Sequence, residues 1–180
     1  EMKKFGINKL NIMGISLGGL VALEYTYKYP GEVDKMILLS VPHSFPDELK
    51  PRLWEAQEIY KKMDVRTIAE ERIHKAFGKI ASIELKQYLI DMISKTPHEV
   101  YIKHSETAIK YDSKNKYKNI QNISLIVCGE LDYIATPAEG EKICKELKFS
   151  ELFIIKDTGH ALSLESPDIL NEKVFEFLMH

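Results

Sequence analysis

Four short apolar runs lie along the chain, and each has the length of a β-strand. They cover residues 10–15, 35–40, 124–129 and 152–155. Continuous apolar runs of this length are typical of parallel strands that helices cover on both faces. Segments of helix-forming residues separate the runs, so the sequence predicts an α/β fold in which helices flank a parallel sheet.

Residues that start or stop helices support this alternation. The helix after the first run is expected to stop at Pro30, because proline does not continue a helix. The helix over 137–147 should begin with Thr136 as N-cap and Glu139 at the capping-box position. A last helix closes the chain, and Ser166 is its expected N-cap. Helices are thus expected after the first, third and fourth runs.

Residues 46–112 differ from the rest of the chain. This segment is charged, lacks strand-like runs and has helical spacing, which predicts three or four short amphipathic helices. Its first apolar face consists of residues three or four positions apart, namely Leu49, Leu53, Ala56, Tyr60 and Met63. We therefore expect an α/β core over 1–45 and 113–180, with a helical insertion over 46–112.

Composition narrows the classes of function. The 180 residues are 44% hydrophobic and 29% charged, as in a soluble globular domain. The formal net charge is -2 without a block of like charge, which argues against nucleic-acid and membrane-surface partners. The apolar stretches are all shorter than the ~18 residues of a membrane span. Cys128 and Cys144 are too few for a disulfide framework and favour a reducing, cytoplasmic compartment.

Ser16 is the first candidate catalytic residue. It lies between Gly14 and Gly18 in the pattern G-x-S-x-G, where the first strand should turn sharply into a helix. We expect both glycines to lie where the chain approaches itself too closely for a Cβ. The turn would expose the serine hydroxyl, and the N–H of Leu17 would stabilise an oxyanion. Glycine-rich turns also hold serines for conformational reasons alone, so the pattern by itself leaves both interpretations open.

The later strands supply partners for this serine. Asp132 follows the third apolar run, and His160 follows the fourth. Groups that follow parallel strands meet at the carboxyl edge of the sheet, where catalytic residues gather. A serine, a histidine and a carboxylate brought together there are the components of nucleophilic catalysis.

Other polar residues have an ordinary explanation beside a functional one. Asp157 is a rival to Asp132 as the acid, although a turn residue is the favoured interpretation. His43 could line the pocket but is better explained as a loop histidine. Glu165 could fix the loop of His160 or serve only as an acid at a helix start. No metal site is predicted from the histidines of the insertion, which lack paired ligand spacing: His74, His98 and His104.

Three segments resemble the catalytic segments of α/β-hydrolase fold proteins, in the branch of esterases, enol-lactonases and cofactor-free haloperoxidases. The resemblance covers the whole chain and rests on GISLGG, GELD…TP and GHALSLESP. It implies that Ser16 is the nucleophile, that His160 is the general base and then the acid, and that Asp132 orients the imidazole. It also implies that the insertion over 46–112 is a helical cap that shapes the substrate pocket.

The resemblance implies an activity as well. We expect a serine hydrolase that cleaves a small-molecule carboxylic ester, thioester or lactone through an acyl-enzyme on Ser16, without a metal or cofactor. Esterase, enol-lactonase, C–C bond hydrolase and perhydrolase share this triad, and the sequence of the insertion leaves the choice among them open.

The position of Ser16 near the start of the chain raises a second question. Only 15 residues precede it, whereas the family places early strands and a loop with a second oxyanion donor before the elbow. Leu17 is therefore the one oxyanion donor that we expect from this chain. The strand over 10–15 would keep an open edge, which is a liability for aggregation.

Two explanations fit this open edge. We expect the chain to be the C-terminal portion of a longer hydrolase, or a partner chain or second copy to cover the edge. The alternative function is that of a noncatalytic fragment, which binds a partner through the edge.

Overall fold

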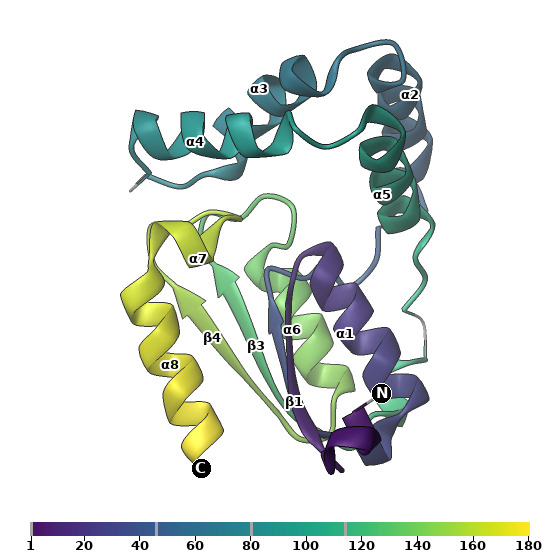
Figure 1. Cartoon of the computed structure of the whole chain (residues 1–180), viewed down its shortest axis with the longest axis vertical. Helices are drawn as coiled ribbons and strands as arrows, with labels where there is room; N and C mark the ends of the chain where they lie inside the picture. The colour runs from purple at the N-terminus through teal and green to yellow at the C-terminus, as the bar shows by residue number, and fades with distance from the viewer. Residues whose placement is uncertain (1, 46, 80, 114) are drawn as a thin grey trace.

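The four apolar runs form one parallel sheet in the order β1-β2-β3-β4 (Figure 1). The structure is a computed structural model, and it describes residues 2–45, 47–79, 81–113 and 115–180. Each strand lies on one predicted run, so the predicted α/β fold with a parallel sheet is confirmed. The strands are β1 (Leu10–Ile15), β2 (Val33–Leu39), β3 (Ile123–Gly129) and β4 (Ser150–Ile155).

The register of the sheet brings the carboxyl ends of the strands to one level. Ile15 at the end of β1 pairs with Leu39, and Leu39 pairs with Val127 of β3. Gly129 at the end of β3 pairs with Ile155 of β4. The loops that follow the strands therefore begin at the same edge of the sheet.

Helices cover both faces of the sheet. On one face lie α1 (Leu17–Lys28) and α6 (Pro137–Glu146). The short α7 (Leu162–Glu165) and the terminal α8 (Pro167–Met179) lie on the other face (Figure 1). This double coverage explains the continuous apolar runs of the central strands. The buried side chains toward α8 include Ile37, Leu39, Leu125, Val127 and Ile155.

The strand β1 is an edge of the sheet within the described residues, because it pairs only with β2. Its side chains alternate between half-buried and exposed. Met13 is 57% exposed and Ile15 is 38% exposed, so the strand presents apolar side chains to solvent in this chain. That a further part of a longer chain, a partner chain or a second copy covers this edge stays a prediction.

Four helices form a separate layer beyond the carboxyl ends of the strands (Figure 1). Two of them, α2 and α5, pack on each other, and α3 packs on α4. The apolar residues between α3 and α4 also contact Ala161, which follows β4. This helical layer consists of α2 (Lys50–Tyr60), α3 (Val65–Ala76), α4 (Ile83–Ile93) and α5 (His98–Lys110).

The helix ends follow the predictions in part. The hydroxyl of Thr136 accepts a hydrogen bond from the N–H of Glu139 and caps α6, as predicted. Ser166, the expected cap of the last helix, makes no capping bond, because its hydroxyl bonds to the hydroxyl of Thr158 (2.7 Å). The short helix α7 was not predicted. None of the described helices is both long and apolar enough to cross a membrane.

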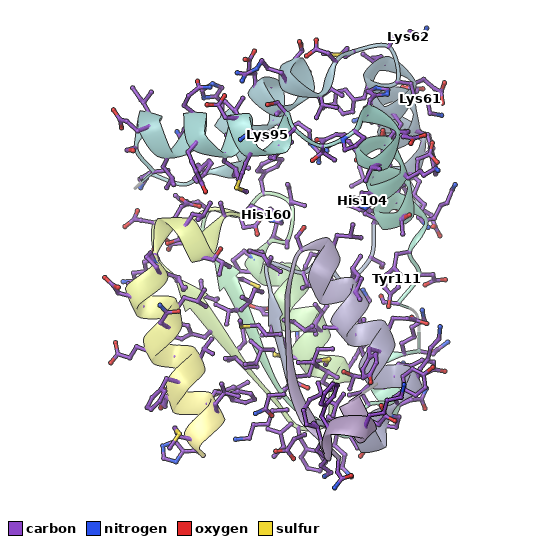
Figure 2. All side chains as sticks on the ribbon, viewed as in Figure 1. Lys61, Lys62, Lys95, His104, Tyr111 and His160 are labelled. Atoms are coloured by element: carbon purple, nitrogen blue, oxygen red, sulfur yellow. The ribbon has the colours of Figure 1, made fainter. Side chains whose placement is uncertain are left out.

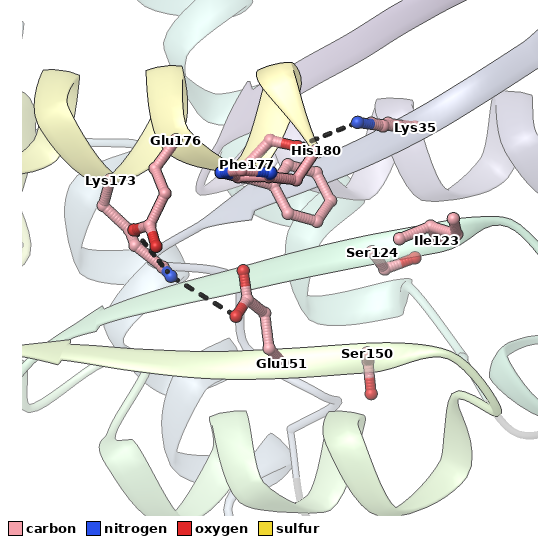
Figure 3. A pocket seen from close by; sticks show the side chains of 9 residues that line it. All are labelled: Lys35, Ile123, Ser124, Ser150, Glu151, Lys173, Glu176, Phe177 and His180. Carbon is pink, nitrogen blue, oxygen red and sulfur yellow. Dashed lines mark hydrogen bonds and ion pairs between the residues drawn. The ribbon is translucent and has the colours of Figure 1, made fainter.

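Two lysines attach α8 to the sheet near the amino ends of the strands (Figure 3). Lys35 donates to the carbonyl oxygens of Phe177 (2.9 Å) and Leu178 (3.1 Å), which lie at the C-terminus of the helix. Lys173 pairs with Glu151 of β4 (3.3 Å). A cation at a helix C-terminus is favourable, so Lys35 helps to hold α8 on the sheet.

Candidate active site

Ser16 occupies a sharp turn between β1 and α1. Its backbone has φ 50° and ψ −118°, a conformation that L-residues rarely adopt and that costs about 1–3 kcal/mol. The surrounding structure holds this conformation: the N–H of Ser16 donates to the carbonyl of Leu39 (2.8 Å), and its own carbonyl accepts from Gly19 (3.0 Å). The turn is thus anchored to the neighbouring strand and to the helix that it starts.

Two glycines, Gly14 and Gly19, make this turn sterically feasible, whereas the pattern indicated Gly14 and Gly18. A Cβ on Gly14 would collide with the carbonyl of Gly18, as expected. A Cβ on Gly18 would meet no atom within 4 Å, so the expected crowding at Gly18 is wrong for this chain. Gly19 is the second crowded position, because its Cβ would collide with the side chain of Val41. The helix start therefore packs on the segment that follows β2.

The loops after β3 and β4 bring a carboxylate and an imidazole to this serine. His160 Nε2 lies 3.0 Å from Ser16 Oγ, and His160 Nδ1 lies 2.8 Å from Asp132 Oδ2. Figure 2 shows His160 between the end of the sheet and the helical layer. The structure thus joins the three residues in one chain of hydrogen bonds, although 144 positions separate Ser16 from His160.

Asp132 is held in its charged form. Its side chain is fully buried, and its Oδ1 accepts hydrogen bonds from the N–H groups of Ile134 (2.8 Å) and Ala135 (2.9 Å). Burial acts to raise the pKa of this carboxyl, but the hydrogen bond and charge of His160, with the two backbone donors, hold the pKa below its usual value. A charged Asp132 fixes the Nδ1–H tautomer of His160, so that Nε2 faces the serine as an acceptor.

Leu17 is the first residue of α1, so its N–H has no acceptor within the helix. It follows Ser16 directly, at the positive end of the helix dipole. This placement suits the N–H for contact with an oxyanion that forms when Ser16 attacks a carbonyl carbon.

A cavity of about 240 Å³ lies over the serine and the histidine. Its walls come from α1, the segment after β2, the helical layer and the loop of Asp132. A wider cavity of about 510 Å³ adjoins it, and both share Phe45, Arg72, Tyr133 and Ile134. We call them the inner and the outer cavity; together they are large enough for a small organic substrate.

Comparisons with known proteins agree on the fold. A sequence model described as alpha/beta hydrolase fold matches residues 1–64. A solved structure, the alpha/beta hydrolase enzyme MGS-M2 from a Medee basin deep-sea metagenome library, superposes with a TM-score of 0.86 at 25% identity, over 99% of this chain and 68% of that chain. The chain therefore has the α/β-hydrolase fold.

Two relatives of the chain have more specific names. The proline iminopeptidase PfmaB of Pestalotiopsis fici is 27% identical over 91% of this chain. The 2-hydroxy-6-oxononadienedioate/2-hydroxy-6-oxononatrienedioate hydrolase of Escherichia coli K12 is 26% identical over 96% of the chain. The chain spans 64% of the length of the first relative and 63% of the second.

The residues that the sequence offered as rivals have other contacts. Asp157 lies in a turn with φ 56° and pairs with Lys79 (3.1 Å) rather than with His160. His43 stacks on Tyr117, with ring centroids 5.3 Å apart, and its Nε2 lies 3.2 Å from Glu146. The part of the chain that the structure describes holds no cluster of potential metal ligands. Both cysteines are free, and Cys128 is buried.

The loop of His160 is fastened to the helical layer by backbone contacts. The N–H of His160 donates to the carbonyl of Ala76 (2.7 Å) at the end of α3. A Cβ on Gly159 would collide with the backbone at Gly78, so the two segments cross at van der Waals distance. Glu165 bridges them, with Oε2 accepting from Gly78 (2.6 Å) and Oε1 from Gly159 (3.0 Å). Of the two interpretations left open for Glu165, the structure favours the one that fixes this loop.

Arg72 lines the inner cavity but was not among the residues predicted from the sequence. It lies on the face of α3 that also carries Ala69, Ile73 and Ala76, and all four line the inner cavity. A charged residue within an apolar helical face was the available signal. Only the packing of α3 over the serine gives that signal a meaning.

Proposed function

We propose that this chain carries the catalytic site of a serine hydrolase, which cleaves a carboxylic ester, thioester or lactone through an acyl-enzyme on Ser16. The observation that carries the proposal is the hydrogen-bonded series from Ser16 through His160 to the buried Asp132, with distances of 3.0 and 2.8 Å. The likeness of the chain to proteins of the α/β-hydrolase fold supports it. A hydroxyl beside an imidazole that a carboxylate orients is suited to nucleophilic catalysis.

We propose one step for each of these residues. His160 Nε2 takes the proton of the Ser16 hydroxyl while the oxygen attacks the carbonyl carbon of the substrate. The N–H of Leu17 stabilises the oxyanion, and Asp132 stabilises the imidazolium. His160 then returns the proton to the leaving oxygen or sulfur, and the acyl-enzyme forms. Water, activated by the same imidazole, hydrolyses the acyl-enzyme in a second round.

The helical layer would act as a cap over this site. It supplies one wall of the inner cavity through α3 and α5, and its contacts with the His160 loop hold that wall in place. The relatives named above include an iminopeptidase and a hydrolase of an oxo-dienedioate, so their names leave the substrate of this chain open.

The test is a panel of p-nitrophenyl esters of increasing acyl length, hydrolysed by this chain and by Ser16→Ala. We expect hydrolysis by the parent chain and loss of it in the variant, since His160 then has no hydroxyl to activate. Equal rates for the two proteins would refute the assignment of the nucleophile. Labelling with a fluorophosphonate probe provides a second measurement, which requires only an activated serine.

The noncatalytic alternative predicts a different result. A fragment that only binds a partner would hydrolyse no ester and would leave the fluorophosphonate unreacted. The relatives named here are hydrolases or a peptidase, and they give that alternative no support.

A further inference from the structure

Arg72 places a fixed charge in a largely apolar cavity. Beside Ser16 and His160, most residues that line the inner cavity are apolar, among them Leu20, Phe45 and Ile73. Among the described residues of that lining, Arg72 is the only one with a side chain that is charged at every physiological pH. The half-buried guanidinium also lines the outer cavity, so it lies where the two cavities join.

Neutral groups hold this guanidinium in position. Its Nη1 donates to the hydroxyl of Tyr101 (3.1 Å) and lies 3.4 Å from the hydroxyl of Ser105, and both residues belong to α5. No ion pair with a carboxylate is found for Arg72 in the described part of the chain.

The acids of the outer cavity have contacts of their own. Glu71 accepts a hydrogen bond from Tyr60 (3.4 Å), and Glu139 pairs with Lys142 (2.6 Å). The guanidinium is therefore oriented by α5 and makes no ion pair with an acid among the described residues.

A positive charge in such a place costs free energy unless an anion joins it. Moving a guanidinium from water into a narrow apolar cavity removes part of its hydration, and hydroxyl groups compensate this only in part. Arginine has five N–H donors in a planar fork, which matches the two oxygens of a carboxylate. The hydrogen bonds to Tyr101 and Ser105 use Nη1 alone. The N–H groups of Nη2 and Nε can therefore donate to a ligand.

We propose that Arg72 binds a free carboxylate of the substrate, so that the preferred substrate is a monoester of a dicarboxylic acid. The inference rests on the proposed hydrolase function of Ser16. The ester group lies at the serine in the inner cavity, and the carboxylate pairs with Arg72 where the outer cavity begins. The apolar walls hold the methylene chain between them.

The test compares two esters of equal chain length, p-nitrophenyl hydrogen adipate and p-nitrophenyl hexanoate. Arg72→Gln should lower kcat/KM for the adipate about tenfold or more, chiefly through KM, because a charge-assisted pair is lost. The hexanoate should change by less than about twofold, since it makes no ion pair. Arg72→Lys keeps the charge without the fork and should fall between the two.

Arg66→Gln is the matched control. Arg66 lies on the same helix, but its guanidinium is exposed and pairs with Asp91 (2.5 Å) on the surface. This variant should treat both esters as the parent chain does. A parent chain without preference for the adipate, or an Arg72→Gln variant that loses both esters equally, would overturn the inference.

A binding measurement separates this inference from the proposed function. Ser16→Ala cannot form an acyl-enzyme, so monomethyl adipate and dimethyl adipate can be titrated into it calorimetrically. The monoester should bind tighter, and adding Arg72→Gln should remove the difference. If the parent chain hydrolyses neither ester but Ser16→Ala shows this difference, the hydrolase proposal fails and the carboxylate site stands. Equal binding of the two adipates overturns the site.

Discussion

The carboxylate of Glu165 and the N–H of Gly78 join the helical layer to the loop that carries His160. Glu165 Oε2 lies 2.6 Å from the nitrogen of Gly78, and Glu165 Oε1 accepts a hydrogen bond from the N–H of Gly159, one residue before the histidine. The side chain of Glu165 is almost fully buried. A buried acceptor shared by two backbone donors couples the position of the imidazole to the position of α3.

Glu165→Gln should weaken this coupling. The amide keeps one oxygen but turns an NH₂ group toward a backbone N–H, so one buried donor loses its partner. We expect the free energy of unfolding in urea to fall by about 1–3 kcal/mol, and kcat to fall more than KM rises. Glu172→Gln, at an exposed position of α8, is the control. An unchanged urea midpoint and an unchanged kcat would contradict the role of Glu165.

Asp132→Asn should abolish most of the activity and leave the fold intact. The amide no longer fixes the tautomer of His160 or stabilises its cation, and the loss of kcat in such a variant is about 10⁴-fold. Ester hydrolysis and fluorophosphonate labelling measure it, while circular dichroism reports the fold. Asp157→Asn removes the rival carboxylate and should change kcat less than about threefold. A larger loss from Asp157→Asn would mean that the wrong acid was chosen.

The lowered pKa of Asp132 predicts a pH-dependent contribution to stability. A carboxyl whose pKa is lower in the folded state than in the unfolded chain stabilises the fold above the unfolded value of about 4. This contribution is lost as the pH falls through the lowered pKa of the folded state. Urea unfolding of the parent chain and of Asp132→Asn should therefore differ most above pH 4 and converge in more acidic solution. A difference that is constant down to pH 2 would count against the shift.

The glycines of the elbow give a matched pair of substitutions. Gly14→Ala brings a Cβ against the carbonyl of Gly18, a backbone atom that cannot move freely. We expect it to lower the free energy of unfolding by about 1–3 kcal/mol. Gly18→Ala places its Cβ in open space, so stability should change by less than about 1 kcal/mol. Thermal unfolding of both variants measures the contrast, which equal effects would contradict.

The sequence by itself determined the order of the elements and the residues that follow each strand. Apolar runs of strand length separated by helical segments specify parallel strands, because both faces of such a strand must be buried. The same logic predicts that Ser16, Asp132 and His160 lie at one edge of the sheet. The cap of α6 at Thr136 also followed from local hydrogen bonding, which depends only on neighbouring residues.

Only the tertiary structure decided the contacts between distant segments. It showed that Gly19 is crowded and that Gly18 is not, because the crowding comes from Val41 on another segment. It showed the two backbone donors of Glu165, and it placed Arg72 in the wall of the cavity that Ser16 lines, since α3 packs over the end of the sheet. Local sequence patterns indicate which residues are buried and where the chain turns. The contacts between distant segments depend on how separate elements pack, and packing is a property of the whole fold.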